Sequence, residues 1–202
     1  MSGGLSNQQV MGYWEKRSAA QGVRTVGFSN LQMSKQDKNY AKRISFVSDF
    51  LDTKVKTIDY GCGIGRYSDL FDSENYLGMD ITQNLIDAAV ERNPEHRYLK
   101  LNQPHLPSLD FNFEQFFTAT VLQHNDDLVV ENIIKSILPI KACGFSFVLY
   151  ENSSPSVFAP HMCPRSPERY RDIVSKFFEV KDFKRKSHVV HGEEHSICVI
   201  EV

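Results

Sequence analysis

The sequence has 202 residues, of which 41% are apolar, 11% aromatic and 24% charged, and its formal net charge is -2. This composition is that of a folded globular protein and excludes a disordered or fibrous chain. The length suits one cored domain, so we expect residues 1–202 to form a single domain. The small net charge disfavours a protein that holds duplex nucleic acid through many phosphate contacts.

The cysteines and the apolar segments bear on the cellular compartment. The cysteines are Cys62, Cys143, Cys163 and Cys198, and their wide spacing matches neither a zinc site nor a dense disulfide framework. We expect reduced thiols. No apolar window is long enough to cross a bilayer, and the first ten residues lack the pattern of a signal peptide. These features predict a cytoplasmic protein with no membrane partner.

The first 54 residues read as helical. Residues 7–22 place Val10, Tyr13 and Trp14 at helical spacing and end at a glycine. Residues 35–52 repeat apolar side chains every three to four positions, which predicts an amphipathic helix. We expect residues 1–54 to form a helical lid over a core at 55–202.

From residue 55 onward, short strands alternate with helices. Strands are predicted at 55–60, 75–80, 96–102, 114–120 and 144–150, with helices at 82–93 and 126–138. Alternation of this kind predicts right-handed crossovers and a parallel sheet with helices on both faces.

The last third of the chain has a different pattern. After a loop at 151–167, a helix is predicted at 166–177 and strands at 178–187 and 194–202. A hairpin connection would make this final strand pair antiparallel. The loop follows the fifth strand, at the sheet edge where open α/β folds carry their ligand contacts.

The segment TIDYGCGIGRYSDLF, residues 57–71, predicts a strand that turns through glycines into a helix. Gly61, Gly63 and Gly65 alternate, unlike the spacing of a dinucleotide fingerprint, and no nucleoside triphosphate loop is present. Two interpretations remain open. The glycines either supply positive φ angles for a tight turn, or they let a ligand approach the backbone.

A second acidic position supports the ligand interpretation. Asp80 ends the second predicted strand, 21 residues after Asp59. A carboxylate there is positioned to accept hydrogen bonds from two ribose hydroxyls. The alternative is that Asp80 caps the helix that begins near Thr82, although Thr82 could cap that helix itself.

Three segments together resemble the Rossmann-like, class I S-adenosylmethionine-dependent methyltransferases. They are IDYGCGIGRY, YLGMDIT and ATVLQHNDD, and the resemblance covers roughly residues 55–202. It implies an α/β fold with a mostly parallel seven-stranded sheet, a terminal antiparallel pair and helices on both faces. It also implies that S-adenosylmethionine is the cofactor and S-adenosylhomocysteine the product.

The resemblance implies roles for residues near the methionine part of the cofactor. Gly61, Gly63 and Gly65 would pass beneath this part. Asp59 would help to position its amino-acid end, and Thr118 would line the cofactor close by.

The resemblance also implies contacts to the nucleoside. Asp80 would hold the ribose and Ile81 would lie against the adenine. Asn102 falls where the family often has an aspartate that reaches the adenine amino group, so here the sequence departs from the family pattern. In related enzymes the first helix often folds over the cofactor, which would bring Tyr13 and Trp14 to it; a packing role for Trp14 is the alternative.

Methyl transfer needs mainly alignment of the acceptor and exclusion of water, and a general base is optional. Candidates for handling an acceptor proton are His124 after the fourth strand, Glu151 at the end of the fifth, and His161 in the following loop. His124 could equally serve in packing or as a local hydrogen-bond partner. Asn152 has the same position as Glu151, but loop composition alone would explain it.

The histidines near the end of the chain do not predict a metal site. His188, His191 and His195 straddle the predicted hairpin and have no matching carboxylate or cysteine pattern. We expect solvated turn histidines and no metal.

The acceptor is expected to be a small molecule, methylated on oxygen or nitrogen. The fourth-strand segment lacks the motifs with which DNA methyltransferases hold a flipped base. Two alternatives stay open: a methyltransferase for a protein side chain or RNA, and a non-catalytic protein that binds the cofactor. Nothing in the sequence specifies an oligomeric state.

Overall fold

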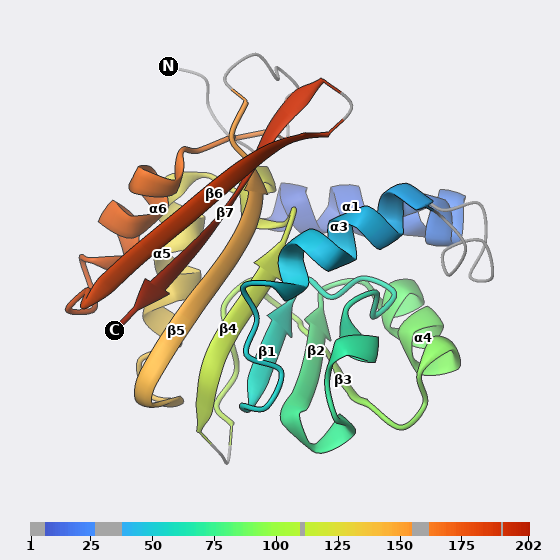
Figure 1. Cartoon of the computed structure of the whole chain (residues 1–202). Coiled ribbons are helices and arrows are strands. Elements are labelled where there is room, and N and C mark those ends of the chain that lie inside the picture. Colours follow the sequence, from blue (N-terminus) through green and yellow to red (C-terminus); the bar gives the residue numbers. More distant parts are fainter. Residues whose placement is uncertain (1–6, 27–37, 110–111, 155–161, 191) are drawn as a thin grey trace.

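The computed structural model describes residues 7–26, 38–109, 112–154, 162–190 and 192–202. Among these, seven strands form one sheet in the order β3-β2-β1-β4-β5-β7-β6 (Figure 1). The strands are β1 Thr57–Tyr60, β2 Tyr76–Asp80, β3 Arg97–Lys100, β4 Phe113–Ala119, β5 Lys141–Asn152, β6 Asp182–Val190 and β7 Glu193–Glu201. All the predicted strands are present.

The pairing of the strands also agrees with the predicted fold class. β1 pairs in parallel with β2 and β4, β2 with β3, and β4 with β5. β7 runs antiparallel to both β5 and β6. Because β1, β2 and β4 are parallel neighbours, their carboxyl ends meet at one edge of the sheet.

The helices lie close to their predicted positions. They are α1 Asn7–Gln21, α3 Lys38–Ser48, α4 Gln83–Arg92, α5 Asp127–Ser136 and α6 Pro167–Val174, with a 3-10 turn, η1, at Gly22–Val26. In α5 and α6 the helix begins after Asp126 and Ser166, whose side chains accept a hydrogen bond from the third residue that follows. No described helix has the length and apolarity required to cross a bilayer.

The helix predicted directly after the glycine turn is absent. The chain instead makes two 3-10 turns, η2 at Ser68–Leu70 and η3 at Ser73–Asn75, before entering β2. Ser, Asp and Asn compete with helix formation because their side chains bond to nearby groups. Here the Ser68 hydroxyl donates to the nearby carbonyl oxygen of Gly65 at 2.7 Å. Contacts from farther along the chain add to this, since Asn93 after α4 donates to Ser68 and Asp69, and Arg92 donates to Asp69.

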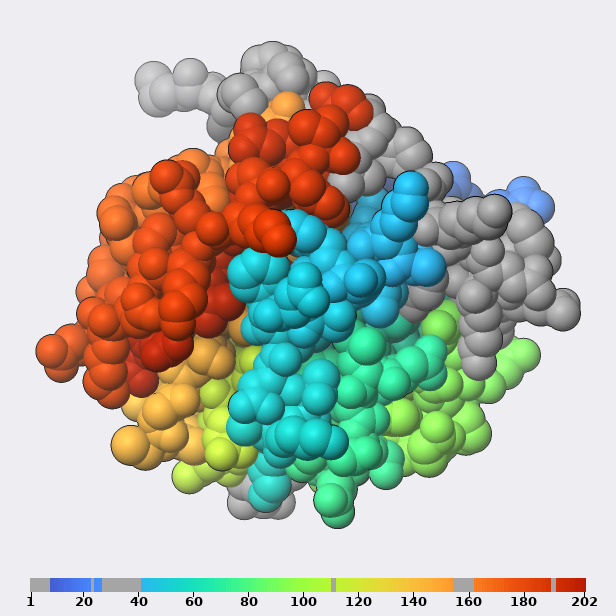
Figure 2. Space-filling model, in the orientation of Figure 1, coloured from blue at the N-terminus to red at the C-terminus, as the bar shows by residue number. Residues whose placement is uncertain are grey.

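Both faces of the sheet are covered, as predicted. The larger core packs α5 and α6 against one face and includes Phe116, whereas Phe117 faces the opposite core with Val47 of α3. Alternate residues of β4 therefore serve different cores, as the period of a strand requires. Figure 2 shows residues of α3 and the segment after it packed beside the C-terminal strands on this second face.

The two N-terminal helices do different things. α1 lies across the carboxyl ends of the strands, as a lid would (Figure 1). α3 covers a sheet face, where Phe46 stacks on His188 of β6 at 3.9 Å between ring centroids. Of residues 1–54, the described part that reaches the sheet edge is therefore α1 with η1.

Candidate active site

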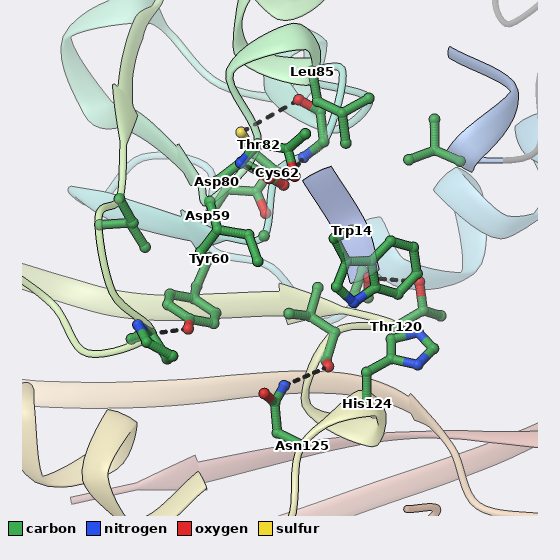
Figure 3. A pocket seen from close by; sticks show the side chains of 18 of the residues that line it. Trp14, Asp59, Tyr60, Cys62, Asp80, Thr82, Leu85, Thr120, His124 and Asn125 are labelled. Atoms are coloured by element: carbon green, nitrogen blue, oxygen red, sulfur yellow. Dashed lines mark hydrogen bonds between the residues drawn. The ribbon is translucent and has the colours of Figure 1, made fainter. Parts of the chain in front are cut away.

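A cavity of about 870 Å³, its open mouth included, lies where β1, β2 and β4 end (Figure 3). Its floor comes from the turns after these strands and its cover from α1 and η1. The residues that line it are Val10, Met11, Trp14, Val26, Asp59, Tyr60, Gly61, Cys62, Gly63, Arg66, Tyr67, Asp80, Ile81, Thr82, Leu85, Leu101, Pro104, Ala119, Thr120, Val121, His124 and Asn125.

The three glycines of the turn have positive φ angles between +56° and +74°. A Cβ on Gly61 would lie 2.3 Å from Cγ2 of Val121, and one on Gly65 would lie 2.7 Å from the Tyr98 hydroxyl oxygen. Gly63 lines the cavity, and there the nearest atom, on Val26, would be 3.3 Å away. Positive φ and the approach of protein side chains thus explain the absence of a side chain at Gly61 and Gly65. Gly61 and Gly63 both line the cavity, and Gly63 has the wider space beside it.

Gly61→Ala is expected to destabilise the protein by roughly 2–5 kcal/mol, because left-handed strain adds to a clash with Val121. Gly144→Ala is the matched control, since Gly144 has the same φ of +74° but open space around it. That variant should lose only about 1–2 kcal/mol. Adding Val121→Ala to Gly61→Ala should recover the part due to the clash. Denaturant unfolding measures all four proteins, and equal losses for the two glycine variants would contradict this account.

Asp59 lies on the floor of the cavity and is 1% exposed. One carboxylate oxygen accepts a hydrogen bond of 2.7 Å from the Tyr76 hydroxyl. Burial raises the pKa of Asp59 to about 7, although the bond from Tyr76 and the charge of Arg66 oppose the increase. The side chain therefore changes charge near neutral pH, and a cation beside it would favour the ionised form.

Asp80 joins the two turns that form the floor. Its Oδ2 accepts a hydrogen bond from the backbone N–H of Gly63 at 3.0 Å, and its Oδ1 accepts one from Thr82 at 2.8 Å. The N-cap of α4 is Thr82, not Asp80, so the capping alternative is not what the structure shows. The Thr82 side chain and the Ile81 backbone also act as hydrogen-bond donors to this carboxylate, which lines the cavity and is 8% exposed. Burial raises the pKa of Asp80.

The opposite wall is the segment that follows β4. Thr120 has a φ of +60°, the one positive value among described residues other than glycine. After it, the 3-10 turn η4, Leu122–His124, brings the His124 imidazole to the cavity. Asn125 steadies this segment by donating from Nδ2 to the carbonyl oxygen of Val121 at 3.0 Å (Figure 3).

α1 meets this wall through Trp14. The centroids of the Trp14 and His124 rings lie 4.9 Å apart, and the rings meet edge to face at the mouth of the cavity (Figure 3). Tyr13 does not line the cavity; its ring meets Trp14 edge to face, and its hydroxyl accepts a hydrogen bond of 2.7 Å from Arg17. The predicted contact of α1 with the site therefore falls on Trp14.

Two residues expected to contact a cofactor lie away from the cavity. Asn102 is exposed, and its side-chain oxygen accepts a bond from Lys100, whereas its neighbour Leu101 lines the cavity. Thr118 is completely buried and donates to Glu151 at 3.4 Å. In both cases a neighbouring residue faces the cavity instead, because successive side chains point in opposite directions.

The residues at the end of β5 are also buried behind the cavity wall. Glu151, 2% exposed, accepts backbone hydrogen bonds from Val121, Leu122 and Gln123 and does not line the cavity. Burial raises its pKa to about 7, against the effect of these three bonds. Asn152 is 1% exposed and donates to Glu193. Glu151 and Asn152 therefore lie behind the cavity wall and do not line the cavity.

His161 lies outside the described residues, as does His191. The other two histidines of the C-terminal group belong to strands, not to a turn as expected. His188 pairs with the Tyr150 hydroxyl at 2.8 Å, and His195, 7% exposed, stacks on the Tyr150 ring. Within the described part of the chain, no group of His, Cys, Asp and Glu is arranged to hold a metal ion.

Some lining residues were not among the predicted site residues. Arg66 directly follows the glycine motif, and its guanidinium donates to the carbonyl oxygen of Val26, tying η1 to the turn. Tyr67, 2% exposed, also lines the cavity, and its hydroxyl has no hydrogen-bond partner within the described structure. Their place immediately after GCGIG was the signal available in the sequence.

Comparison with known proteins agrees with this arrangement. Residues 58–136 match the family model described as a methyltransferase domain. The matched segment contains β1 from Ile58 onward, the glycine turn, Asp80 and His124. A search of curated protein sequences finds no significant match.

Solved structures share the fold at low sequence identity. Magnesium protoporphyrin IX methyltransferase from Synechocystis PCC 6803, with bound S-adenosylhomocysteine, is 14% identical with a TM-score of 0.69, over 97% of this chain and 99% of that one. The N-methyltransferase NodS from Bradyrhizobium japonicum WM9 is 12% identical with a TM-score of 0.69, over 97% and 98%. Phosphoethanolamine N-methyltransferase 1 from Haemonchus contortus is 17% identical with a TM-score of 0.71, over 98% of this chain but 50% of that chain.

Proposed function

We propose that the chain is an S-adenosylmethionine-dependent methyltransferase for a small-molecule acceptor, because residues 58–136 match a methyltransferase-domain model and the sheet has the Rossmann-like fold of solved methyltransferases. The observation that carries this proposal is the pair of acidic residues at one cavity floor. Asp59 is the last residue but one of β1 and Asp80 is the last residue of its parallel neighbour β2, while Gly63, whose N–H donates to Asp80, also lines the cavity. A nucleoside with a cationic amino-acid end needs these groups.

The lining residues match the parts of the cofactor. Asp80 lines the cavity, and its carboxylate would accept bonds from the ribose hydroxyls. Leu101, in place of Asn102, and Ile81 would offer apolar contact to the adenine. We assign Asp59 to the ammonium group and Arg66 to the carboxylate of the amino-acid end, since their charges are complementary.

When bound, the cofactor supplies an electrophilic methyl group on a sulfonium. The chain contributes alignment and exclusion of water, for which α1 covers the cavity with Val10, Met11 and Trp14. The aromatic face of Trp14 suits a cationic neighbour. His124, on the opposite wall, is the lining residue best able to accept a proton from an oxygen or nitrogen acceptor.

The acceptor is proposed to be a small molecule because the cavity is partly enclosed by the chain itself. Structural relatives named for small acceptors, magnesium protoporphyrin IX and phosphoethanolamine, support this class without identifying the compound. The proposal extends to the whole chain as one domain, with α1 as the lid. His161, which lies outside the described residues, stays a sequence-based candidate for touching the acceptor.

Calorimetric titration of S-adenosylhomocysteine into the purified protein tests cofactor binding. Labelled S-adenosylmethionine incubated with panels of small amines, phenols and carboxylic acids then tests transfer. Absence of binding would overturn the proposal. Binding without transfer to any small acceptor, but with transfer to protein or RNA, would replace the acceptor class, and binding without any transfer would favour a non-catalytic protein.

The affinity for S-adenosylhomocysteine is expected to increase about 30-fold between pH 5.5 and pH 8. The pKa of Asp59 is about 7 without ligand, and the ligand's ammonium group would lower it, so binding releases a proton and tightens as Asp59 ionises. Asp59→Asn should remove most of this pH dependence. Asp87→Asn, at an exposed position of α4, is the control and should retain it. A pH dependence that persists unchanged in Asp59→Asn would contradict the assignment.

A further inference from the structure

Glu151, near the end of β5, acts as the N-terminal cap of the 3-10 turn η4, which follows β4. Its Oε1 accepts the backbone N–H groups of Val121 at 3.2 Å and Leu122 at 3.1 Å, and its Oε2 accepts that of Gln123 at 3.2 Å. These N–H groups stand at the start of η4. Val121 occupies the N-cap position there, and its side chain makes no capping hydrogen bond. Such groups otherwise lack partners, and a carboxylate satisfies them strongly.

The carbonyl groups of the same turn are held from the other side. Arg165 donates to the carbonyl oxygens of Leu122 at 3.1 Å and Asn125 at 2.6 Å. The backbone N–H of Cys163 donates to the carbonyl oxygen of Gln123 at 2.6 Å. The donors of the turn are thus held by the buried Glu151, and its acceptors by the buried Arg165 and the half-buried Cys163. This arrangement can maintain a strained conformation such as the positive φ of Thr120.

Side chains of the segment 120–124 line the cavity. Thr120, Val121 and His124 line it, and the His124 ring meets Trp14 of the lid. Glu151 lies behind them, so its effect on the cavity passes through the backbone it holds.

We propose that Glu151 is a positioning residue: its carboxylate fixes the turn at 120–124 and thereby holds His124 against Trp14 at the cavity mouth. The role in catalysis rests on the proposed function. The positional role does not, because it concerns contacts within the chain, and its test needs neither cofactor nor acceptor.

The test uses Trp14 fluorescence, since Trp14 is the sole tryptophan. His124→Ala removes the ring that contacts Trp14 and is expected to change its emission clearly in the wild-type background. In Glu151→Gln, where one acceptor oxygen is replaced by a donor, the same His124→Ala change should have less than about a third of that effect, because His124 has already left the ring. This comparison is a double-mutant cycle.

Glu114→Gln is the matched control. Glu114 also accepts a backbone hydrogen bond, from Lys56 at 3.1 Å, but at the opposite end of β4. In that background His124→Ala should have its full effect. Circular dichroism establishes that each variant is folded, and if Glu151→Gln is not, Glu151→Asp replaces it, because a shorter carboxylate cannot retain all three N–H contacts.

Two results would overturn the proposal. One is an undiminished His124→Ala effect in a folded Glu151 variant, even if that variant melts at a lower temperature, since this would leave Glu151 with a structural role alone. The other is no emission change on His124→Ala in the wild type. Loss of S-adenosylhomocysteine binding or of methyl transfer is measured separately and would count against the proposed function instead.

Discussion

Replacing Asp80 with alanine is expected to weaken S-adenosylhomocysteine binding by roughly 30-fold to 1000-fold and, at the same time, to destabilise the unliganded protein. Removal of two charge-assisted hydrogen bonds to the ribose in a partly desolvated site costs roughly 2–4 kcal/mol of binding free energy. The second effect follows from the protein's own contacts, because the N–H groups of Gly63 and Thr82 lose their acceptor. That loss is worth about 1–3 kcal/mol.

Asp80→Asn separates the two effects. Its amide retains one acceptor oxygen, so part of the bridge between the turns remains while the charge that strengthens the ribose bonds is lost. Calorimetric titration gives the affinity, and thermal melts without ligand give the stability, on the same samples. A lowered melting temperature with unchanged affinity in both variants would show that Asp80 serves the turns alone and would remove the main support for the nucleoside site.

Replacing His124 with alanine is expected to lower the rate of methyl transfer by about 100-fold or more if the acceptor must lose a proton, since general base catalysis commonly contributes this much. The dissociation constant for S-adenosylhomocysteine should change only a few-fold, because His124 lines the wall opposite Asp59 and Asp80 (Figure 3). The comparison of turnover at saturating cofactor with binding affinity distinguishes these two effects.

His105→Ala is the control, because His105 is exposed and does not line the cavity. If the methyl-transfer rate of the wild type falls at low pH, the rate of His105→Ala should fall in the same way. The rate of His124→Ala should not show this fall. If both substitutions have small and equal effects on turnover, His124 has only the packing role that its contact with Trp14 supports.

The strands of the sheet, most helices and the floor of the cavity could be predicted from the amino-acid sequence. Apolar periodicity is a local property, so β1 to β7 and α4 to α6 could be read from it, and the hairpin fixed the antiparallel pair. Asp59, Gly63 and Asp80 could be placed because parallel strands bring their carboxyl ends to one edge whatever the details of packing.

Which of two neighbouring residues at a strand end faces the cavity depends on tertiary packing and could not be predicted. Leu101 lines the cavity and Asn102 does not, and Thr118 contacts Glu151 instead of the cavity. Successive residues of a strand point to opposite sides, so an error of one residue in the predicted position selects the wrong neighbour. The missing helix after the glycine turn has a similar cause, since Ser68 and Asp69 find partners on α4, far along the chain.

The roles of Gly61 and Glu151 depended on the same kind of long-range contact. Gly61 must lack a side chain because Val121 packs on it, and Glu151 is buried because the turn after β4 presents three N–H groups to it. Local sequence specifies the backbone conformation that a residue favours, but the groups that satisfy its charge or fill its space come from other strands. Those partners exist only once the sheet has assembled.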